Sequence, residues 1–137
     1  MIDAKIAYEI LAADAGARMG RLLTPHGEVT TPAFMPVGTR AAVKAMAPDE
    51  LWTMGYRIVL ANAYHLAVRP GADLIREMGG LARFMGFSGA VLTDSGGFQA
   101  MSLAKINRID ENGIRFRSHV DGAAVVLTRR QGWAGRR

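Results

Sequence analysis

The chain has 137 residues, half of them apolar and 21% charged, with a formal net charge of +5 and no cysteine. This length allows one domain, and the composition is typical of a folded globular chain. The lack of cysteine excludes disulfides, a thiolate nucleophile and thiolate zinc ligands from this stretch of sequence. No apolar run nears the roughly 20 residues of a membrane helix, and the first ten residues lack the form of a signal peptide. We therefore expect a cytoplasmic location and no membrane partner.

The positive charge is concentrated at the end of the sequence. Four of the 17 basic residues (Arg129, Arg130, Arg136 and Arg137) lie in the last nine positions. Without them, 13 basic residues stand against 12 acidic ones, a net charge of +1. The body of the chain is therefore nearly neutral, and an interpretation as a basic nucleic-acid-binding domain depends almost wholly on this tail.

The N-terminal part of the sequence is typical of short strands joined by turns. Residues 6–13 and 17–24 flank a glycine-bearing turn at 14–16, which predicts an antiparallel hairpin. A second turn is expected at 26–27. The short apolar run 33–37, bounded by proline and glycine, then predicts a buried strand.

The middle of the sequence predicts alternating helices and strands. We expect a helix that begins at Pro48 and ends at Gly55, followed by a strand over 58–60. A helix over 72–78, with Leu74, Ile75 and Met78 on one apolar face, comes next. A short helix over 81–87 and a strand over 90–92 complete this part. With the strand at 33–37 this order is βαβαβ, which implies a parallel sheet with right-handed crossovers. A polar loop comes after each strand, and in such folds the carboxyl ends of the strands carry the chemistry.

After residue 104 the pattern changes to alternating segments separated by Asn112-Gly113 and Asp121-Gly122. These dipeptides favour tight turns, so the segment 105–128 predicts a small antiparallel meander.

The first candidate site is the loop that comes directly after the strand at 90–92. It consists of Asp94, Ser95, Gly96, Gly97, Phe98 and Gln99. The glycines allow the backbone to approach a ligand, Asp94 is able to exchange a proton, Gln99 both donates and accepts hydrogen bonds, and Phe98 is able to stack on a flat ring. This set suits a planar heterocycle better than an anion. An alternative stays open from the pattern alone, in which Asp94 only caps backbone amides of a turn.

The second candidate site comes after the strand at 58–60. Here Asn62 and His65 are suited to ribose hydroxyls or a phosphate, and Arg69 to a phosphate. A lone histidine is more often a packed or capping residue, so a structural role for His65 is the alternative. His26 and His119 stand in turns and are not site candidates, and no spacing of histidines or carboxylates predicts a metal site.

Four stretches together resemble the N-terminal part of the tRNA-guanine transglycosylase family, also called the queuine tRNA-ribosyltransferase family, in its bacterial form. They are PAFMPVGT at 32–39, NAYHLAVRPG at 62–71, LTDSGGFQAMSL at 92–103 and GIRFRSHVDG at 113–122. The resemblance covers about residues 6–128. It implies an α/β fold containing about the first three strands of a TIM (β/α)8 barrel, with an N-terminal β-hairpin and an antiparallel β insertion.

The resemblance also implies an activity and roles for residues. Members replace the wobble guanine of tRNA with a 7-deazaguanine such as preQ1 by double displacement: an aspartate attacks the ribose anomeric carbon, guanine leaves, and the new base attacks the covalent intermediate. On the matching positions, Asp94 is the proton acceptor and residues 94–98 line the base pocket. Val37, Leu60 and Asn62 edge the ribose pocket, and His65 and Gln99 support the loop.

The sequence departs from the family after residue 128. The family's nucleophilic aspartate and its zinc site of three cysteines and one histidine come from sequence that is absent here, so we expect no zinc bound by this chain and no activity of it alone. We divide the chain into a family part, 1–128, and a basic tail, 129–137, and interpret the tail as the result of truncation or a frameshift. A non-catalytic binding module or partner subunit stays open as an alternative, as do queuine or an archaeal precursor in place of preQ1. Family precedent suggests a homodimer.

Overall fold

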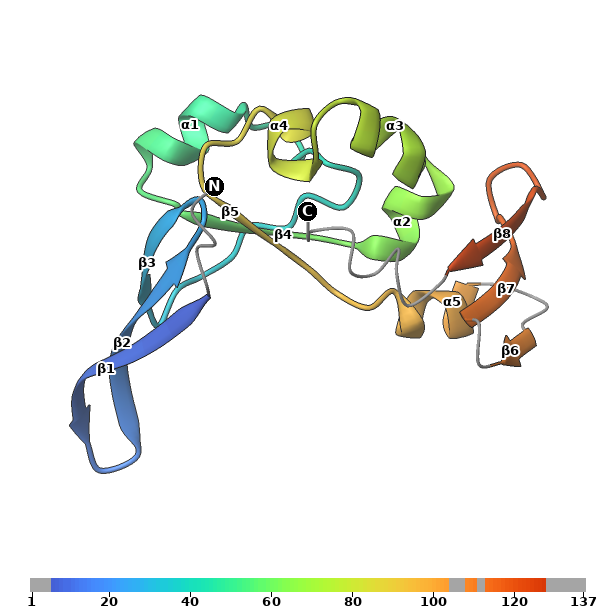
Figure 1. Cartoon of the computed structure of the whole chain (residues 1–137). Helices are drawn as coiled ribbons and strands as arrows, with labels where there is room; N and C mark the ends of the chain where they lie inside the picture. Colours follow the sequence, from blue (N-terminus) through green and yellow to red (C-terminus); the bar gives the residue numbers. More distant parts are fainter. Residues whose placement is uncertain (1–5, 104–107, 111–112, 128–137) are drawn as a thin grey trace.

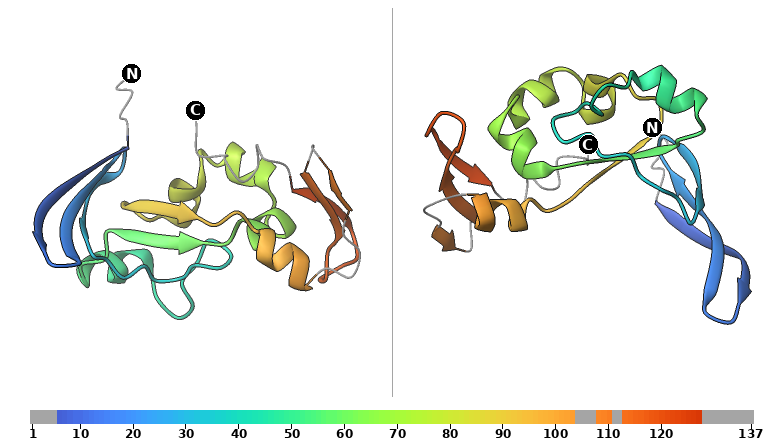
Figure 2. Two further views of the ribbon diagram at one scale, coloured as in Figure 1. Left: turned by 90° about the horizontal axis from the view of Figure 1, so that it is seen from below. Right: turned by 180° about the vertical axis from the view of Figure 1, so that it is seen from behind.

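The computed structural model describes residues 6–103, 108–110 and 113–127 and has a mixed α/β architecture (Figures 1 and 2). The strands are β1 (Ala7–Asp14), β2 (Ala17–Thr24), β3 (Gly27–Thr31), β4 (Ile58–Ala61), β5 (Ala90–Thr93), β6 (Arg108–Asp110), β7 (Gly113–Arg117) and β8 (Ala124–Leu127), and the helices are α1 (Pro48–Thr53), α2 (Ala63–Val68), α3 (Ala72–Glu77), α4 (Leu81–Met85) and α5 (Gly97–Leu103). The strands form three separate sheets, β1-β2-β3, β4-β5 and β6-β7-β8. Within the described residues these sheets do not close into a barrel.

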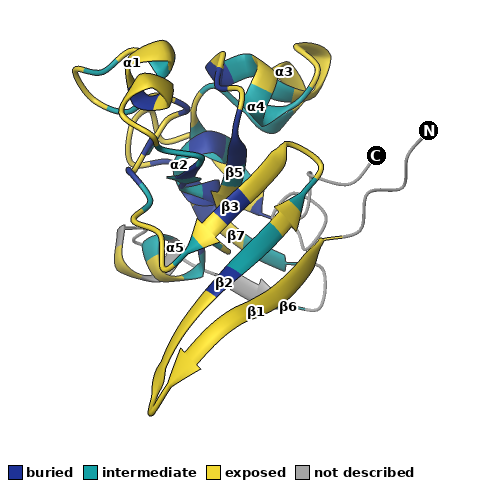
Figure 3. Ribbon diagram, turned by 90° about the vertical axis from the view of Figure 1, so that its left-hand side faces the viewer, coloured by how far each residue is buried: buried dark blue, intermediate teal, exposed yellow. Residues whose placement is uncertain are grey.

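The N-terminal hairpin is confirmed. Strands β1 and β2 pair antiparallel from Ala7↔Leu23 to Asp14↔Ala17, and β3 adds to β2 after a turn in which Gly27 has a φ of +110°. Arg21 on the central strand β2 pairs with Glu9 on β1 at 2.6 Å and with Glu28 on β3 at 3.5 Å, so one guanidinium links three strands. The hairpin projects away from the rest of the molecule, and every residue of β1 is exposed (Figure 3).

The parallel part of the fold is smaller than predicted. Strands β4 and β5 pair in parallel from Ile58↔Ala90 to Ala61↔Thr93, as expected. The strand predicted at 33–37 is wrong, because this segment makes only the isolated bridge Val37↔Leu60, with Leu60 N–H donating to Pro36 O at 2.9 Å and Gly38 N–H donating to Leu60 O at 2.6 Å. Pro36 in this segment lacks the N–H group that a continuous ladder requires.

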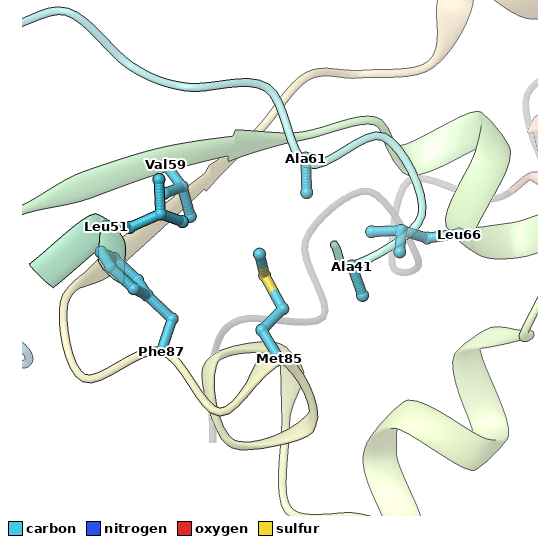
Figure 4. Close-up of a cluster of buried hydrophobic side chains, with 7 residues drawn as sticks. All are labelled: Ala41, Leu51, Val59, Ala61, Leu66, Met85 and Phe87. Atoms are coloured by element: carbon cyan, nitrogen blue, oxygen red, sulfur yellow. The ribbon is translucent and has the colours of Figure 1, made fainter. Parts of the chain in front are cut away.

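The core lies where helices cover one side of the β4–β5 pair. Figure 4 shows its buried members converging on one space: Ala41, Leu51, Val59, Ala61, Leu66, Met85 and Phe87. They come from α1, β4, α2 and α4, with Ala41 from the segment before α1 and Phe87 from the segment after α4, so one cluster unites most of the central elements. Helices α1, α3 and α4 are confirmed. The apolar face predicted for the helix at 72–78 is wrong in part, because Leu74 and Met78 are exposed and only Ile75 packs against the core.

Two helices replace predicted loops. The sequence after β4 forms α2, and Gly97–Gln99, predicted as loop, form the first turn of α5. The backbone N–H of Ala63 in the first turn of α2 donates to the carboxylate of Asp94, which lies 31 residues further along the chain. A cap supplied from such a distance leaves no local sequence signal.

The C-terminal meander is confirmed where it is described. Strands β6, β7 and β8 pair antiparallel, and the predicted turn at Asp121-Gly122 joins β7 to β8, with Gly122 at a φ of +73°. The predicted turn at 112–113 includes residue 112, which lies outside the described residues. This sheet packs on α2 through a second buried cluster, Tyr64, Phe116 and Leu127. None of the helices in the described ranges is long and apolar enough to cross a membrane.

Candidate functional site

The two polar segments that the sequence analysis singled out meet at one edge of the parallel pair. The last residues of β4 and β5 face each other as Ala61↔Thr93, and Asn62 and Asp94 come directly after them. The N–H of Asp94 donates to Ala61 O at 3.3 Å, which carries the ladder one residue beyond the strands. The carboxyl ends of parallel strands meet at the same edge of a sheet, and this places both segments side by side.

Four donors surround the carboxylate of Asp94. Its Oδ1 accepts hydrogen bonds from the backbone N–H of Ala63 at 2.8 Å and of Gly96 at 3.1 Å. Its Oδ2 accepts from Asn62 Nδ2 at 2.7 Å and from Gln99 Nε2 at 3.1 Å. A carboxylate offers about four acceptor positions, so all of them are taken and its orientation is fixed.

The four donors divide into two kinds. The backbone donors, Ala63 and Gly96, cap a helix and close a turn, which is the structural role that the sequence left open for Asp94. The side-chain donors, Asn62 and Gln99, end in amides on rotatable bonds, and each is able to turn away without unfolding the backbone. Asp94 is thus held in place by the backbone and is open to exchange of its side-chain partners.

The loop after Asp94 lies tightly against α2. Gly96 is buried with a φ of +70°, and a Cβ atom there would lie 2.7 Å from the backbone nitrogen of Tyr64 and 3.0 Å from Cδ2 of Leu127. Ser95 Oγ accepts a hydrogen bond from the N–H of Gly97 at 3.3 Å. The ring of Phe98 is 79% exposed. The loop therefore needs glycine at position 96, and it leaves the aromatic ring of Phe98, four residues after Asp94, uncovered.

The structure brings together most, not all, of the residues predicted for the site. Val37, half exposed, is bridged to Leu60, two residues before Asn62. His65 makes no hydrogen bond to Asp94 among the described contacts, whereas Gln99 does. The imidazole of His65 instead meets the ring of Tyr64 edge-on, with centroids 5.2 Å apart.

Tyr64 and His119 form a second cluster with His65 that the sequence analysis missed. Tyr64 is fully buried, stacks on Phe116 and on His119, and its hydroxyl lies 2.9 Å from Nδ1 of His119. Burial raises the pKa of Tyr64 above its ordinary value, so the phenol stays protonated. The sequence places Tyr64 directly before His65 in a motif and His119 in the turn before Asp121. Nothing in the sequence indicates that Tyr64 and His119 contact each other in the fold.

The electrostatics of His65 depend on its neighbours. Its pKa is lowered from the ordinary 6.5, first by burial and then by electrostatic interaction with His119 and Arg40, while the carboxylate of Asp94 acts in the opposite direction. The imidazole is therefore neutral at pH 7. This places Arg40, another residue that the sequence analysis did not single out, within electrostatic reach of the cluster.

Comparison with known proteins identifies the family. Residues 14–132 match the family model described as queuine tRNA-ribosyltransferase, a range that ends inside the tail predicted at 129–137. Three similar proteins are named queuine tRNA-ribosyltransferase. The protein of Symbiobacterium thermophilum is 55% identical, and the match covers 90% of this chain and 31% of that protein. The proteins of Desulforudis audaxviator and Moorella thermoacetica are each 56% identical, and the matches cover 90% and 89% of this chain and 34% and 33% of those proteins.

This chain thus spans about a third of the length of the curated relatives it matches. The matched range contains both segments of the candidate site, including Asn62 and Asp94. The chain belongs to the queuine tRNA-ribosyltransferase family.

Proposed function

We propose that this chain provides the base-handling part of a tRNA-guanine transglycosylase, which exchanges the wobble guanine of tRNA for preQ1 in the cytoplasm. The observation that carries the proposal is the carboxylate of Asp94, fixed by four donors at the point where two parallel strands end. Membership of the family supports it. In this proposal β4 and β5 are neighbouring strands of a (β/α)8 barrel.

Asp94 acts as the proton acceptor for the incoming base. The base that replaces guanine must lose a proton to attack the ribose, and a carboxylate beside the purine accepts that proton. For the base to donate to Asp94, one of the present donors must withdraw. The amides of Asn62 and Gln99 are the ones free to do so, while the backbone N–H groups of Ala63 and Gly96 keep Oδ1 in place.

The loop and its neighbours receive the nucleotide. The exposed ring of Phe98 offers a face for stacking on the purine, and residues 95–97 present backbone groups beside it. Val37 and Leu60 lie next to Asn62 and edge the ribose. His65 supports this arrangement through Tyr64, on the same helix as Ala63.

We assign neither the nucleophile nor a zinc site to this chain. The chain has no cysteine, and within the described ranges no three side chains of His, Asp or Glu gather to hold a metal ion, so the residues present do not fit the zinc site that the resemblance implies. We assign no step to zinc here. We propose that an aspartate of the longer protein attacks the ribose. We also propose that the 137 residues alone are inactive.

A graft tests whether the chain is competent for this role. Residues 6–127 replace the matching segment of the Symbiobacterium thermophilum relative, and incorporation of radiolabelled guanine into a tRNA with a wobble guanine is measured. We expect incorporation by the graft at a rate comparable with the relative, and none by the 137-residue chain.

Two results would contradict the proposal. A folded graft that binds the tRNA without incorporating guanine supports the alternative of a non-catalytic binding module. Turnover by the purified 137-residue chain contradicts the assignment of the nucleophile to the longer protein.

A further inference from the structure

A polar hollow of about 210 Å3 opens beside the Tyr64 cluster. Three parts of the chain line it: the turn after the Val37 bridge, helix α2 with the residue next to its end, and the turn between β7 and β8. Its polar lining residues are Thr39, Arg40, His65, Arg69 and His119, and none of the residues that line it is acidic. Segments 80 residues apart in the sequence thus direct four basic groups to one place.

The charge of this hollow is not neutralised by ion pairs. The guanidinium groups of Arg40 and Arg69 are charged at any physiological pH. Neither forms a salt bridge within the described part of the chain, whereas Arg21 and Arg76 both do. Two acids that interact electrostatically with lining residues have partners of their own: Asp94 has its four donors, and Asp121 has Ser118 and the N–H of Ala123, with the charge of Arg69 adding to the lowering of its pKa.

Two histidines add their imidazole rings to the lining of this hollow. The Tyr64 hydroxyl lies 2.9 Å from Nδ1 of His119, so this ring nitrogen already has a hydrogen-bond partner. His65 lies edge-on to His119, with ring centroids 6.0 Å apart. Two guanidinium groups, imidazole N–H groups and the Thr39 hydroxyl form the donor set that recognises a phosphate.

The position of the hollow indicates which phosphate it takes. His65 lines the hollow and also lies within the field of Asp94, and it stands three residues after Asn62, on α2. We propose that this hollow binds a backbone phosphate of the tRNA, next to the nucleotide whose base is exchanged. The identity of the RNA rests on the proposed function, while the preference for a phosphodiester rests on the hollow alone.

The first test uses inorganic phosphate and the three histidines of the chain. The Hε1 resonances of His65, His119 and His26 are monitored by NMR during titration of the 137-residue chain, and their dispersion in the same spectrum reports folding. We expect phosphate to shift His65 and His119 and to leave His26, which lies in the β2–β3 turn, unchanged. Equal shifts of all three, or none, would overturn the proposal.

The second test uses an anticodon stem-loop RNA and matched arginine variants. Arg40→Gln and Arg69→Gln are each expected to weaken binding about tenfold and to reduce the salt slope by about 0.7, the values for one lost charged contact to a single strand. Arg76→Gln, in which the arginine on α3 is paired with Asp73, is the control and should bind as the unaltered chain does. The terminal arginines are present in every variant and do not affect the comparison.

An RNA with an abasic wobble position separates the two proposals. If Arg40→Gln and Arg69→Gln weaken binding of both RNAs while Asp94→Asn changes neither, the phosphate site stands and the base-handling function falls. If both arginine variants bind like Arg76→Gln, the phosphate site is wrong, whatever Asp94→Asn does.

Discussion

At the scale of single residues, the site depends on side chains that have both a structural and a chemical use. Asp94 joins the ends of β4 and β5, caps α2 and closes its own turn, and the same carboxylate is the acceptor proposed for the base. The sequence presented these as alternatives. The geometry makes them compatible, because backbone donors and exchangeable amides occupy different oxygens.

Gly96 is the residue on which the loop geometry depends most. Replacement by alanine puts a side chain at a φ of +70° and a Cβ 2.7 Å from the Tyr64 nitrogen, so we expect Gly96→Ala to lower the free energy of unfolding by about 2 kcal/mol or more. Urea unfolding of the chain measures this. Gly97→Ala is the control, because its Cβ meets only Ser95 Oγ at 3.4 Å, and an equal loss in both variants would contradict the argument.

His65 makes stability depend on pH. Its pKa is lowered in the folded chain, so the unfolded chain takes up a proton first, near the ordinary 6.5, and the folded state loses stability as the pH falls below that value. We expect the unfolding free energy of His65→Gln to fall less between pH 7.5 and 5.5 than that of the unaltered chain. His26→Gln should keep the original slope, and a slope unchanged in His65→Gln would show that burial of this imidazole is not the cause.

At the scale of elements, the sequence predicted correctly the helices, hairpins and turns that depend on residues close together in the chain. The hairpin around residue 15, the helix that begins at Pro48 and the meander after residue 104 result from turn residues, capping residues and alternation, and all are confirmed. Helix α2 was missed because its cap is Asp94, 31 residues away. The strand at 33–37 was predicted from an apolar run between proline and glycine, but the segment makes only one bridge, and Pro36 inside it has no N–H to donate.

The candidate site was likewise predicted where it depends on local sequence and missed where it depends on long-range packing. Asp94, Asn62 and Gln99 were identified because polar residues come directly after apolar strands, and the structure joins them. Tyr64 and Arg40 were not singled out and His119 was set aside, because only packing brings the β7–β8 turn with His119, and the segment with Arg40, up to His65 on α2. Long-range packing of this kind has no signature in a single sequence.

The docking of α1 tests the central cluster. Leu51 is 2% exposed and meets Val59 and Phe87 in that cluster, so Leu51→Ala should lower the free energy of unfolding by about 2–5 kcal/mol. Leu74→Ala on α3 removes the same atoms from a side chain that is 43% exposed, and we expect it to cost much less. Similar losses in urea unfolding would mean that the cluster does not hold these elements together.

At the scale of the whole molecule, three separate sheets leave strand edges and apolar side chains uncovered. Strand β1 is exposed along its length, including Tyr8, Ile10 and Leu11, and within the described residues only one of its edges is paired. The outer edge of β5 is also unpaired there. Exposed edges of this kind favour pairing between chains.

We therefore expect the purified chain to associate as its concentration rises, as measured by light scattering after size-exclusion chromatography. Ile10→Lys, which puts a charge on the open strand, should reduce this association, because lysine at a sheet edge opposes pairing. Arg76→Lys is the control, because it retains the charge on α3. A chain that stays monomeric at all concentrations would contradict the expectation.

The central claim, that Asp94 is the group that takes the proton of the base, is tested most directly by the guanine-incorporation rate of the graft carrying Asp94→Asn. Asparagine keeps the size of the side chain but removes the proton acceptor, so kcat/KM should fall by about 10²–10⁴-fold. The control is Asp73→Asn, which changes an exposed carboxylate on α3 and should leave the rate unaltered. If Asp94→Asn incorporates guanine within tenfold of the unaltered graft, Asp94 has only the structural role and the claim is wrong.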